Sequence, residues 1–310
     1  SRGSVQVVAK LTETIKKGVV FLPMHWGKTL QKDLTRANNL TSSAFDPTSK
    51  QPGFKFSAVE VKPHKKPAQK IVIVGAGAAA YRFINTHREL NLDDEIHVFS
   101  KEEFPFYNRV LLPEYINDQK QWEDLLKFKI GEFEKLNVHL HQSNSIESID
   151  PALKMVTDQF GVSHSYDTLV MATGSRAFVP SDVPIHLPGI FTMRDRRNAD
   201  ELKATVGEGS HVVVVGGGLL GLELAAALAE VKIRVSIIQL SSRLMERQLD
   251  SLASTLLRQE IENMGIQVYT NDQVQSVERI NEQCLEAKLK SGKSLISHAI
   301  VYAIGTRPNL

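Results

Sequence analysis

The chain has 310 residues, of which 42% are hydrophobic and 23% charged, a globular balance that excludes a disordered chain. This length suits about two domains, and no apolar run reaches the roughly 18 residues of a membrane span. The single cysteine, Cys284, excludes an internal disulfide and argues against an iron–sulfur cluster or a structural zinc within these residues. With no signal-peptide pattern at the start, we expect a reducing, cytoplasmic location.

Charge is unevenly distributed along the chain. Residues 1–70 carry 13 Lys and Arg against 4 Asp and Glu, whereas the net charge of the whole chain is only +2. Such asymmetry indicates two units with different partners. A basic segment often binds nucleic acid, but stacking aromatics and a recognition-helix pattern are missing, so we expect no nucleic-acid partner. An anionic cofactor and a solvated face both remain consistent with the charge.

The first 62 residues have a β-rich pattern. Strands are expected at residues 5–11, 18–22 and 56–61, separated by a turn-rich polar stretch at 25–54. Two prolines and three lysines follow in Lys62–Pro67, which predicts a linker over residues 63–69.

A glycine turn follows the first strongly apolar run, Ile71–Val74, which is typical of a strand buried in a parallel sheet. The pattern is G-x-G-x-x-A. Gly75 allows the tight turn, Gly77 allows the backbone to approach a pyrophosphate, and Ala80 allows close helix packing. The free N–H groups of the following helix would then bind the anion.

The same arrangement recurs after the run Val212–Val215. Gly216, Gly218 and Gly221 form G-x-G-x-x-G ahead of an alanine-rich helix that also carries Glu223. Two matches in the right context are far more specific than one. Strands and helices alternate around both turns, so we expect an α/β fold with two Rossmann-like dinucleotide-binding units.

The choice of nucleotide is left open by the residues at the second strand of each unit. An acidic residue at this strand end usually binds the adenosine ribose, but the first unit has Ser100 there. Nearby Glu102 could take the role of the acid. The second unit has Gln239, which does not repel a 2′-phosphate, and Arg243, which would attract one. Both NADH and NADPH therefore remain candidates.

The sequence offers no acid–base pair and no metal ligand set that we single out. His139 and His141 alternate on one expected strand, which is more typical of a partly exposed strand face than of a metal site. We therefore assign no catalytic side chain and no metal ligand.

Residues 70–310 resemble the flavin-dependent pyridine-nucleotide reductases that have two dinucleotide-binding domains. The resemblance rests on the two glycine turns, on the segment Leu169–Ser175, and on the segment Ala303–Asn309. It implies FAD in the first unit, with Thr173 and Gly174 alongside, and NADH or NADPH in the second. It also implies hydride transfer from nicotinamide C4 to flavin N5.

A narrower resemblance is to the flavin module of assimilatory NAD(P)H-nitrite reductase large subunits. It rests on Tyr107, Asn108 and Arg109 and on the long run Leu244–Asp250. It implies that residues 107–109 lie near the isoalloxazine. The disulfide-reductase branch needs a cysteine pair, which this chain lacks, so electrons would leave the flavin without a dithiol.

Residues 1–62 resemble the C-terminal end of molybdopterin-dependent nitrate reductases. The matching positions are residues 1–3, 18–26, 38–41, 46–47, 49–52 and 55. In that family this end belongs to a β-barrel domain that contacts molybdopterin guanine dinucleotide. The resemblance makes the following residues candidates for that contact: His25, Asn39, Gln51 and Lys55.

The two resemblances together imply an assimilatory nitrate reductase fused to an NAD(P)H-oxidising FAD module. The expected domains are 1–62 (part of the molybdopterin dinucleotide-binding β domain), 63–69 (linker), 70–195 (FAD, first part), 196–302 (NAD(P)) and 303–310 (returning FAD segment). Partners implied are an upstream molybdenum domain, with an iron–sulfur centre as an open option, and no membrane. Alternatives are a nitrite reductase module, a stand-alone ferredoxin or rubredoxin reductase, and a non-catalytic docking segment.

Overall fold

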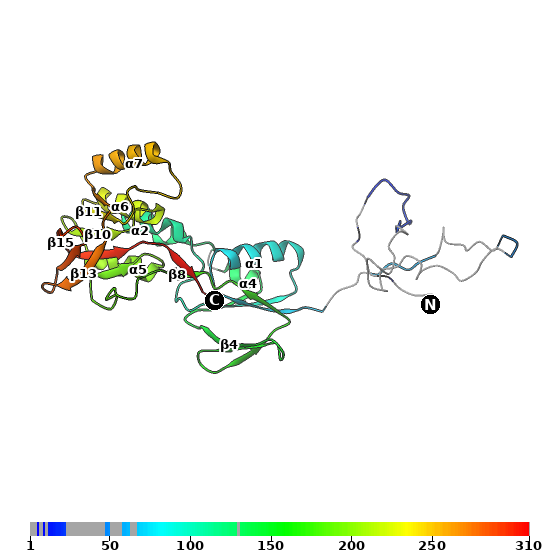
Figure 1. Cartoon of the computed structure of the whole chain (residues 1–310). Coiled ribbons are helices and arrows are strands. Elements are labelled where there is room, and N and C mark those ends of the chain that lie inside the picture. The colour runs from blue at the N-terminus through cyan, green and yellow to red at the C-terminus, as the bar shows by residue number, and fades with distance from the viewer. Residues whose placement is uncertain are drawn as a thin grey trace. The chain divides into compact units, whose positions relative to one another are not determined.

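A computed structural model describes residues 5, 9, 12–22, 47–49, 58–62, 67–128 and 131–309. The chain divides into two compact units, Ser1–Pro67 and Ala68–Leu310 (Figure 1). In the described part of the first unit, residues 12–22 and 58–62 form bends, turns and irregular chain without a strand. The strand expected at 18–22 is therefore wrong, and so is the described part of the strand at 56–61. A strand needs a hydrogen-bonded neighbour, which these residues do not have among the described ones.

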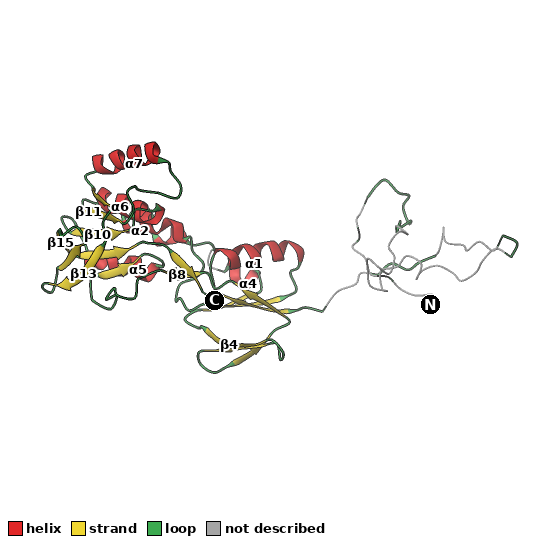
Figure 2. Ribbon diagram, viewed as in Figure 1, coloured by secondary structure: helices red, strands yellow, loops and turns green. Residues whose placement is uncertain are grey.

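The second unit begins with a parallel sheet in the order β3-β2-β1-β7. Its strands are β1 (Lys70–Val74), β2 (Glu95–Phe99), β3 (Val138–His141) and β7 (Thr168–Met171). One face packs against α1 (Ala78–Leu90) and α4 (Glu132–Lys135). The other packs against an antiparallel sheet of β4 (Ile146–Asp150), β5 (Met155–Asp158) and β6 (Ser163–Ser165), visible in Figure 2.

A second parallel sheet has the order β12-β11-β10-β16-β9. Its strands are β9 (Ile190–Thr192), β10 (His211–Val215), β11 (Arg234–Gln239), β12 (Gln267–Thr270) and β16 (Ala299–Tyr302). One face packs against α5 (Arg196–Thr205), α6 (Leu219–Glu230) and α7 (Ser251–Asn263). The other packs against the antiparallel sheet of β13 (Val274–Arg279), β14 (Leu285–Leu289) and β15 (Ser294–Ser297).

The segment after β2 joins the two sheets. It contains η3 (Arg109–Leu111), α2 (Leu112–Ile116) and α3 (Trp122–Leu125). Its apolar side chains are buried in the core on the helical face of the second sheet. Tyr115 Oη donates to Asp200 Oδ1 over 2.7 Å, which anchors α2 to α5. A second link is the antiparallel pair β8 (Ser175–Ala177) and β17 (Thr306–Pro308).

The α/β class predicted from the sequence is confirmed. Both apolar runs are central strands, β1 and β10, and each is followed by its glycine turn and helix. Val72 and Val214 are fully buried, as expected for strands covered on both faces. Among the helices of the described residues, none is long and apolar enough to cross a bilayer.

Candidate functional site

Two equivalent glycine turns lie at the carboxyl ends of β1 and β10. Gly75 has φ +106° and Gly216 has φ +118°, a left-handed region that favours glycine. Each turn is closed by the same bond to the neighbouring strand: Gly75 N–H donates to Phe99 O and Gly216 N–H to Ile238 O, both over 2.8 Å. Ligands of such open parallel sheets bind outside the carboxyl ends of the strands.

Each first glycine is also pressed against a second chain segment. A Cβ on Gly75 would collide with the carbonyl oxygen of Ala172, just after β7. A Cβ on Gly216 would stand 2.5 Å from the carbonyl oxygen of Ala303, just after β16. The two units are therefore built alike. The segment around Thr173 lies against the first glycine turn as the segment around Ile304 lies against the second.

The second glycine of each turn faces open space instead. Gly77 and Gly218 are the N-caps of α1 and α6, with no side-chain cap bond. No heavy atom lies within 4 Å of a Cβ built on either glycine. The space beside each of these glycines, at the N-terminus of its helix, is therefore open, which suits a pyrophosphate bound by the free N–H groups there.

The third small residue of each turn lets the helix pack closely on the strand. Ala80 is fully buried, and a Cβ on Gly221 would collide with the carbonyl oxygen of Gly216. The residues of both turns therefore fit the dinucleotide pyrophosphate that the sequence predicts at each of them.

The segment after β7 is tied to the segment after β17. Thr173 Oγ1 donates to Asn309 O, and Asn309 Nδ2 donates back to Thr173 O, both over 2.8 Å. Gly174, with φ +67°, accepts from the Asn309 N–H over 3.0 Å. The sequence analysis did not single out Asn309, although the matching segment 303–309 contains it.

Glu102, Tyr107 and Arg109 form one half-buried network. Glu102 pairs with Arg109 through an Oε1–Nη2 distance of 2.6 Å and accepts from Tyr107 Oη over 2.8 Å. Burial raises the pKa of the Tyr107 phenol, which stays a neutral donor. The network reaches the second sheet's helices, because the Arg196 N–H donates to Tyr107 Oη and Arg109 donates to Arg194 O.

This network bears on two of the predicted roles. The Glu102 carboxylate, predicted as the ribose partner, is engaged by Arg109 and Tyr107. Asn108, predicted near the flavin ring, caps η3 by accepting from the Val110 N–H. The sequence did not indicate Arg194 and Arg196, because nothing in the local pattern reveals a contact with residues about 85 positions earlier.

The residues predicted for the second nucleotide lie around the second turn. Gln239 Oε1 accepts from the Gly217 N–H over 2.7 Å, so this side chain braces the turn. Arg243 is exposed close by. Glu223 is half-buried on α6, and burial, followed by the nearby Glu114 carboxylate, raises its pKa.

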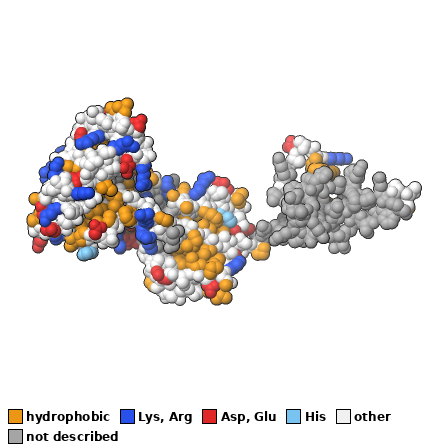
Figure 3. Space-filling model, in the orientation of Figure 1, with side chains coloured by type: hydrophobic (Ala, Val, Ile, Leu, Met, Phe, Trp, Pro, Cys, Tyr) orange, Lys and Arg blue, Asp and Glu red, His pale blue; other side chains and the backbone are white. Residues whose placement is uncertain are grey.

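Exposed apolar side chains lie at the end of β7, at the start of α6 and in η3. Met171 is 55% exposed, Leu219 59% and Val110 70%. Figure 3 shows apolar patches on the surface of the second unit. Exposed apolar surface of this kind is commonly covered by a ligand or a partner.

The remaining predicted site residues cannot be placed. They are His25, Asn39, Gln51 and Lys55, all outside the described residues.

Comparisons with known proteins match two family models to two separate segments of the chain. Residues 69–310 match the model of the pyridine nucleotide-disulphide oxidoreductase family, and residues 1–58 match the model of the molydopterin dinucleotide binding domain. The nitrite reductase (NAD(P)H) large subunit of Klebsiella oxytoca is 35% identical over 241 residues, which cover 77% of this chain and 25% of that protein.

Two further proteins are similar over the same region. The assimilatory nitrate reductase electron transfer subunit of Bacillus subtilis (strain 168) is 29% identical over 78% of this chain and 31% of that protein. A solved structure, a NAD-dependent persulfide reductase from A. fulgidus, superposes with a TM-score of 0.73 at 26% identity, over 77% of this chain and 46% of that one. The chain thus spans a quarter to a third of the length of the two curated relatives.

Proposed function

Since this chain belongs to the pyridine nucleotide-disulphide oxidoreductase family, we propose that it is the electron-entry module of an assimilatory nitrate reductase. The module itself is an NAD(P)H-dependent flavin oxidoreductase. The finer assignment to nitrate reduction is supported by one observation: a molybdopterin dinucleotide binding match stands directly before the flavin module in the same chain.

The order of the two matches favours nitrate as the final substrate over nitrite or a small redox protein. The similar flavin modules belong to nitrite and nitrate reductases alike, so they do not separate these acceptors. A molybdopterin-type segment upstream in the same chain favours nitrate, because it would link the flavin module covalently to a molybdenum domain. The matching segment, residues 1–58, also lies within the strongly basic start of the chain, which suits an anionic dinucleotide.

We assign the first turn to FAD and the second to NADH or NADPH. Gly75, Gly77 and Ala80 would hold the FAD pyrophosphate at the N-terminus of α1, with Thr173 and Gly174 alongside. Gly216, Gly218 and Gly221 would hold the nicotinamide nucleotide at α6. The remaining residues assigned to these two cofactors are Glu102, Tyr107, Asn108, Arg109, Glu223, Gln239 and Arg243.

The domain limits proposed from the sequence follow from this assignment. Residues 70–195 and 303–310 would form the FAD domain, and residues 196–302 the NAD(P) domain. Residues 1–62, with His25, Asn39, Gln51 and Lys55 as contacts, would face molybdopterin guanine dinucleotide, and 63–69 would be the linker.

The chain's own part in the reaction is to bind and orient. When bound, the nicotinamide and the flavin supply the hydride transfer between them. The network of Glu102, Tyr107 and Arg109 fixes the segment that joins the two sheets, so the two nucleotide turns keep a defined geometry. The single cysteine, Cys284, lies after β13, so no cysteine pair of this chain takes part in passing electrons on.

Nitrate reduction by the full-length protein tests the proposal. The protein, purified with its flavin, should contain molybdenum and oxidise NADH or NADPH when nitrate is added. Nitrite as the preferred acceptor, or a protein without molybdenum, would move the assignment to a nitrite reductase module or a stand-alone reductase.

A further inference from the structure

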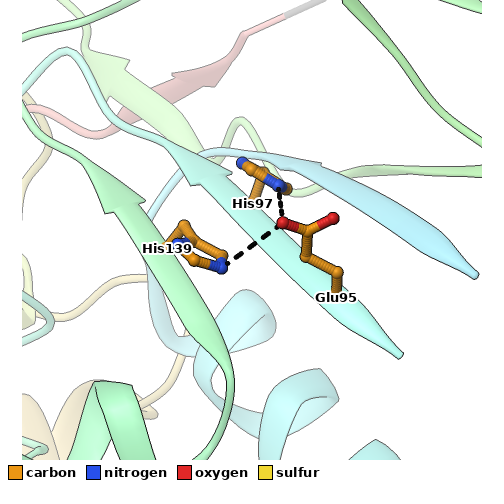
Figure 4. A group of neighbouring side chains, drawn as sticks. All are labelled: Glu95, His97 and His139. Carbon is orange, nitrogen blue, oxygen red and sulfur yellow. Dashed lines mark ion pairs between the residues drawn. The ribbon is translucent and has the colours of Figure 1, made fainter. Parts of the chain in front are cut away.

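Three metal-binding side chains meet on the first sheet, on the face that β4–β6 cover. Glu95 and His97 are two residues apart on β2 and therefore lie on the same face of the sheet. His139 on β3 is paired with His97 in the parallel register. One carboxylate oxygen, Glu95 Oε1, is 3.1 Å from His97 Nε2 and 3.5 Å from His139 Nε2 (Figure 4). One ligand atom from each residue lies within 4.8 Å of the others.

These distances suit a shared cation. Zinc binds imidazole nitrogen and carboxylate oxygen at about 2.0–2.2 Å, so two ligand atoms of a tetrahedral site stand about 3.4 Å apart. The two distances from Glu95 Oε1 bracket this value. In this structure the His139 ring stacks on His97 with centroids 4.8 Å apart, so it must rotate out of the stack to complete the set. Its exposed position leaves solvent space for that rotation.

The orientation of His97 favours a cation over a plain hydrogen bond. Its Nε2 atom is buried and makes no hydrogen bond of acceptable geometry, although Glu95 Oε1 is only 3.1 Å away. A hydrogen bond needs the acceptor near the N–H axis. When an ion bridges the two groups, His97 Nε2 and Glu95 Oε1 both point at the ion. The oxygen then lies off the N–H axis of His97.

A neighbouring histidine supports His97 from the other side. His97 Nδ1 is 3.0 Å from His141 Nε2, and the His141 ring stacks on Phe99 with centroids 4.4 Å apart. Histidines that bind metals typically donate their second ring N–H to an acceptor such as a carboxylate, a backbone carbonyl or water, which fixes the tautomer. The group within reach of His97 Nδ1 here is His141 Nε2. In the tautomer in which His97 Nδ1–H donates to His141 Nε2, the Nε2 lone pair of His97 is directed toward the cluster.

We propose that Glu95, His97 and His139 form a site for a divalent transition-metal ion, with Zn²⁺ as the best match. Two imidazoles and one carboxylate suit zinc, and the exposed side chains leave a fourth position for water. The site needs no cysteine, so the low cysteine content of the chain does not bear on it.

The place of the site in the fold indicates what the ion would do. Glu95 begins β2, whereas the Gly75 turn bonds to Phe99 at the opposite end of that strand, about 13 Å away at 3.3 Å per residue. The ion would join the edge strand β3 to β2. We therefore expect it to stabilise the edge of the first sheet and to leave flavin reduction unchanged.

Zinc titration of the full-length, EDTA-stripped protein tests this. By calorimetry the protein should bind one Zn²⁺ at this site, and Glu95→Gln or His139→Ala should weaken that binding at least tenfold, since even lost outer partners cost metal sites 10–100-fold. Binding should also weaken as the pH falls and the imidazoles protonate. His186→Ala, at an exposed histidine away from the cluster, is the matched control and should bind as the parent does.

A second readout is thermal stability. Zinc should raise the Tm of the parent and of His186→Ala but not that of His139→Ala, whose exposed position makes the substitution harmless to folding. Equal zinc affinity in the Glu95 and His139 variants and the control, or no zinc binding by the parent, would overturn the proposal.

Discussion

The carbonyl oxygen of Ala172 occupies the position that a side chain on Gly75 would need. This contact joins the first glycine turn to the segment after β7, and Ala303 makes the equivalent contact with Gly216. Each turn is thus shaped by its own backbone conformation and by a neighbouring strand end. A substitution at the first glycine of a turn should therefore affect folding, whereas one at the second glycine should affect nucleotide binding.

Gly75→Ala should destabilise the fold. The alanine would have to adopt φ +106° and displace the Ala172 carbonyl, which together should lower the free energy of unfolding by at least about 2 kcal/mol. Urea unfolding measures this. Gly77→Ala is the control, since its φ is −97° and nothing lies within 4 Å, and it should unfold close to the parent.

Gly77→Val should remove FAD and leave the fold intact, with a Tm that matches that of the FAD-stripped parent. The valine side chain would project into the open space at the N-terminus of α1, where we place the pyrophosphate. The bound flavin of the purified full-length protein gives the answer. Normal flavin content in a folded Gly77→Val protein would refute the placement.

The enzyme should discriminate weakly between NADH and NADPH. Neutral Gln239 braces the second turn and exposed Arg243 is close by, so the end of β11 itself carries no carboxylate to repel a 2′-phosphate. The ratio of kcat/KM for the two nucleotides should stay below about 100-fold, or 2.7 kcal/mol. Gln239→Glu should shift that ratio toward NADH, and a larger native preference would contradict the assignment.

Glu102→Gln should destabilise the chain more than loss of an ordinary surface pair. The side chains of Arg109 and Glu102 are only 26% and 17% exposed, so the expected loss is roughly 1–3 kcal/mol. The matched control is Glu208→Gln, which breaks the exposed pair with Lys232 and should cost under about 1 kcal/mol. Equal losses in urea unfolding would show that the network does not hold the joining segment.

Glu114→Gln should raise the Tm at pH 8 and leave it unchanged at pH 4. Burial and Glu114 raise the pKa of Glu223, so the folded chain holds that proton more tightly than the unfolded chain. The stability from this group is full below the ordinary glutamate pKa and is lost as pH rises through the raised one. Glu89→Gln, at an exposed acid on α1, is the control and should show no such pH-dependent gain.

The sequence predicted the elements that depend on local patterns and missed those that depend on register. Four-residue apolar runs followed by spaced glycines identified β1, β10 and both turns, because strand burial and turn geometry are local requirements. The contact of Asn309 with Thr173 depends on strand pairing over more than a hundred residues. The contact between His97 and His139 likewise depends on the register in which β2 pairs with β3.

The first unit shows the opposite error. Val19 and Phe21 belong to a stretch of good strand formers, yet they are 52% and 77% exposed and no strand forms there. Strand propensity is realised only against a neighbouring strand and a buried face, so the local pattern overpredicted β-structure.

Anaerobic mixing of the FAD-loaded full-length protein with NADH or NADPH tests whether the first turn holds FAD and the second a nicotinamide nucleotide. The oxidised-flavin absorbance should disappear with nucleotide in the parent, because both turns are intact. In Gly218→Val, which blocks only the open space at α6, the flavin should stay bound but be reduced far more slowly. A parent protein whose bound flavin is reduced by neither nucleotide, or a Gly218→Val protein reduced at the parent rate, would contradict the account.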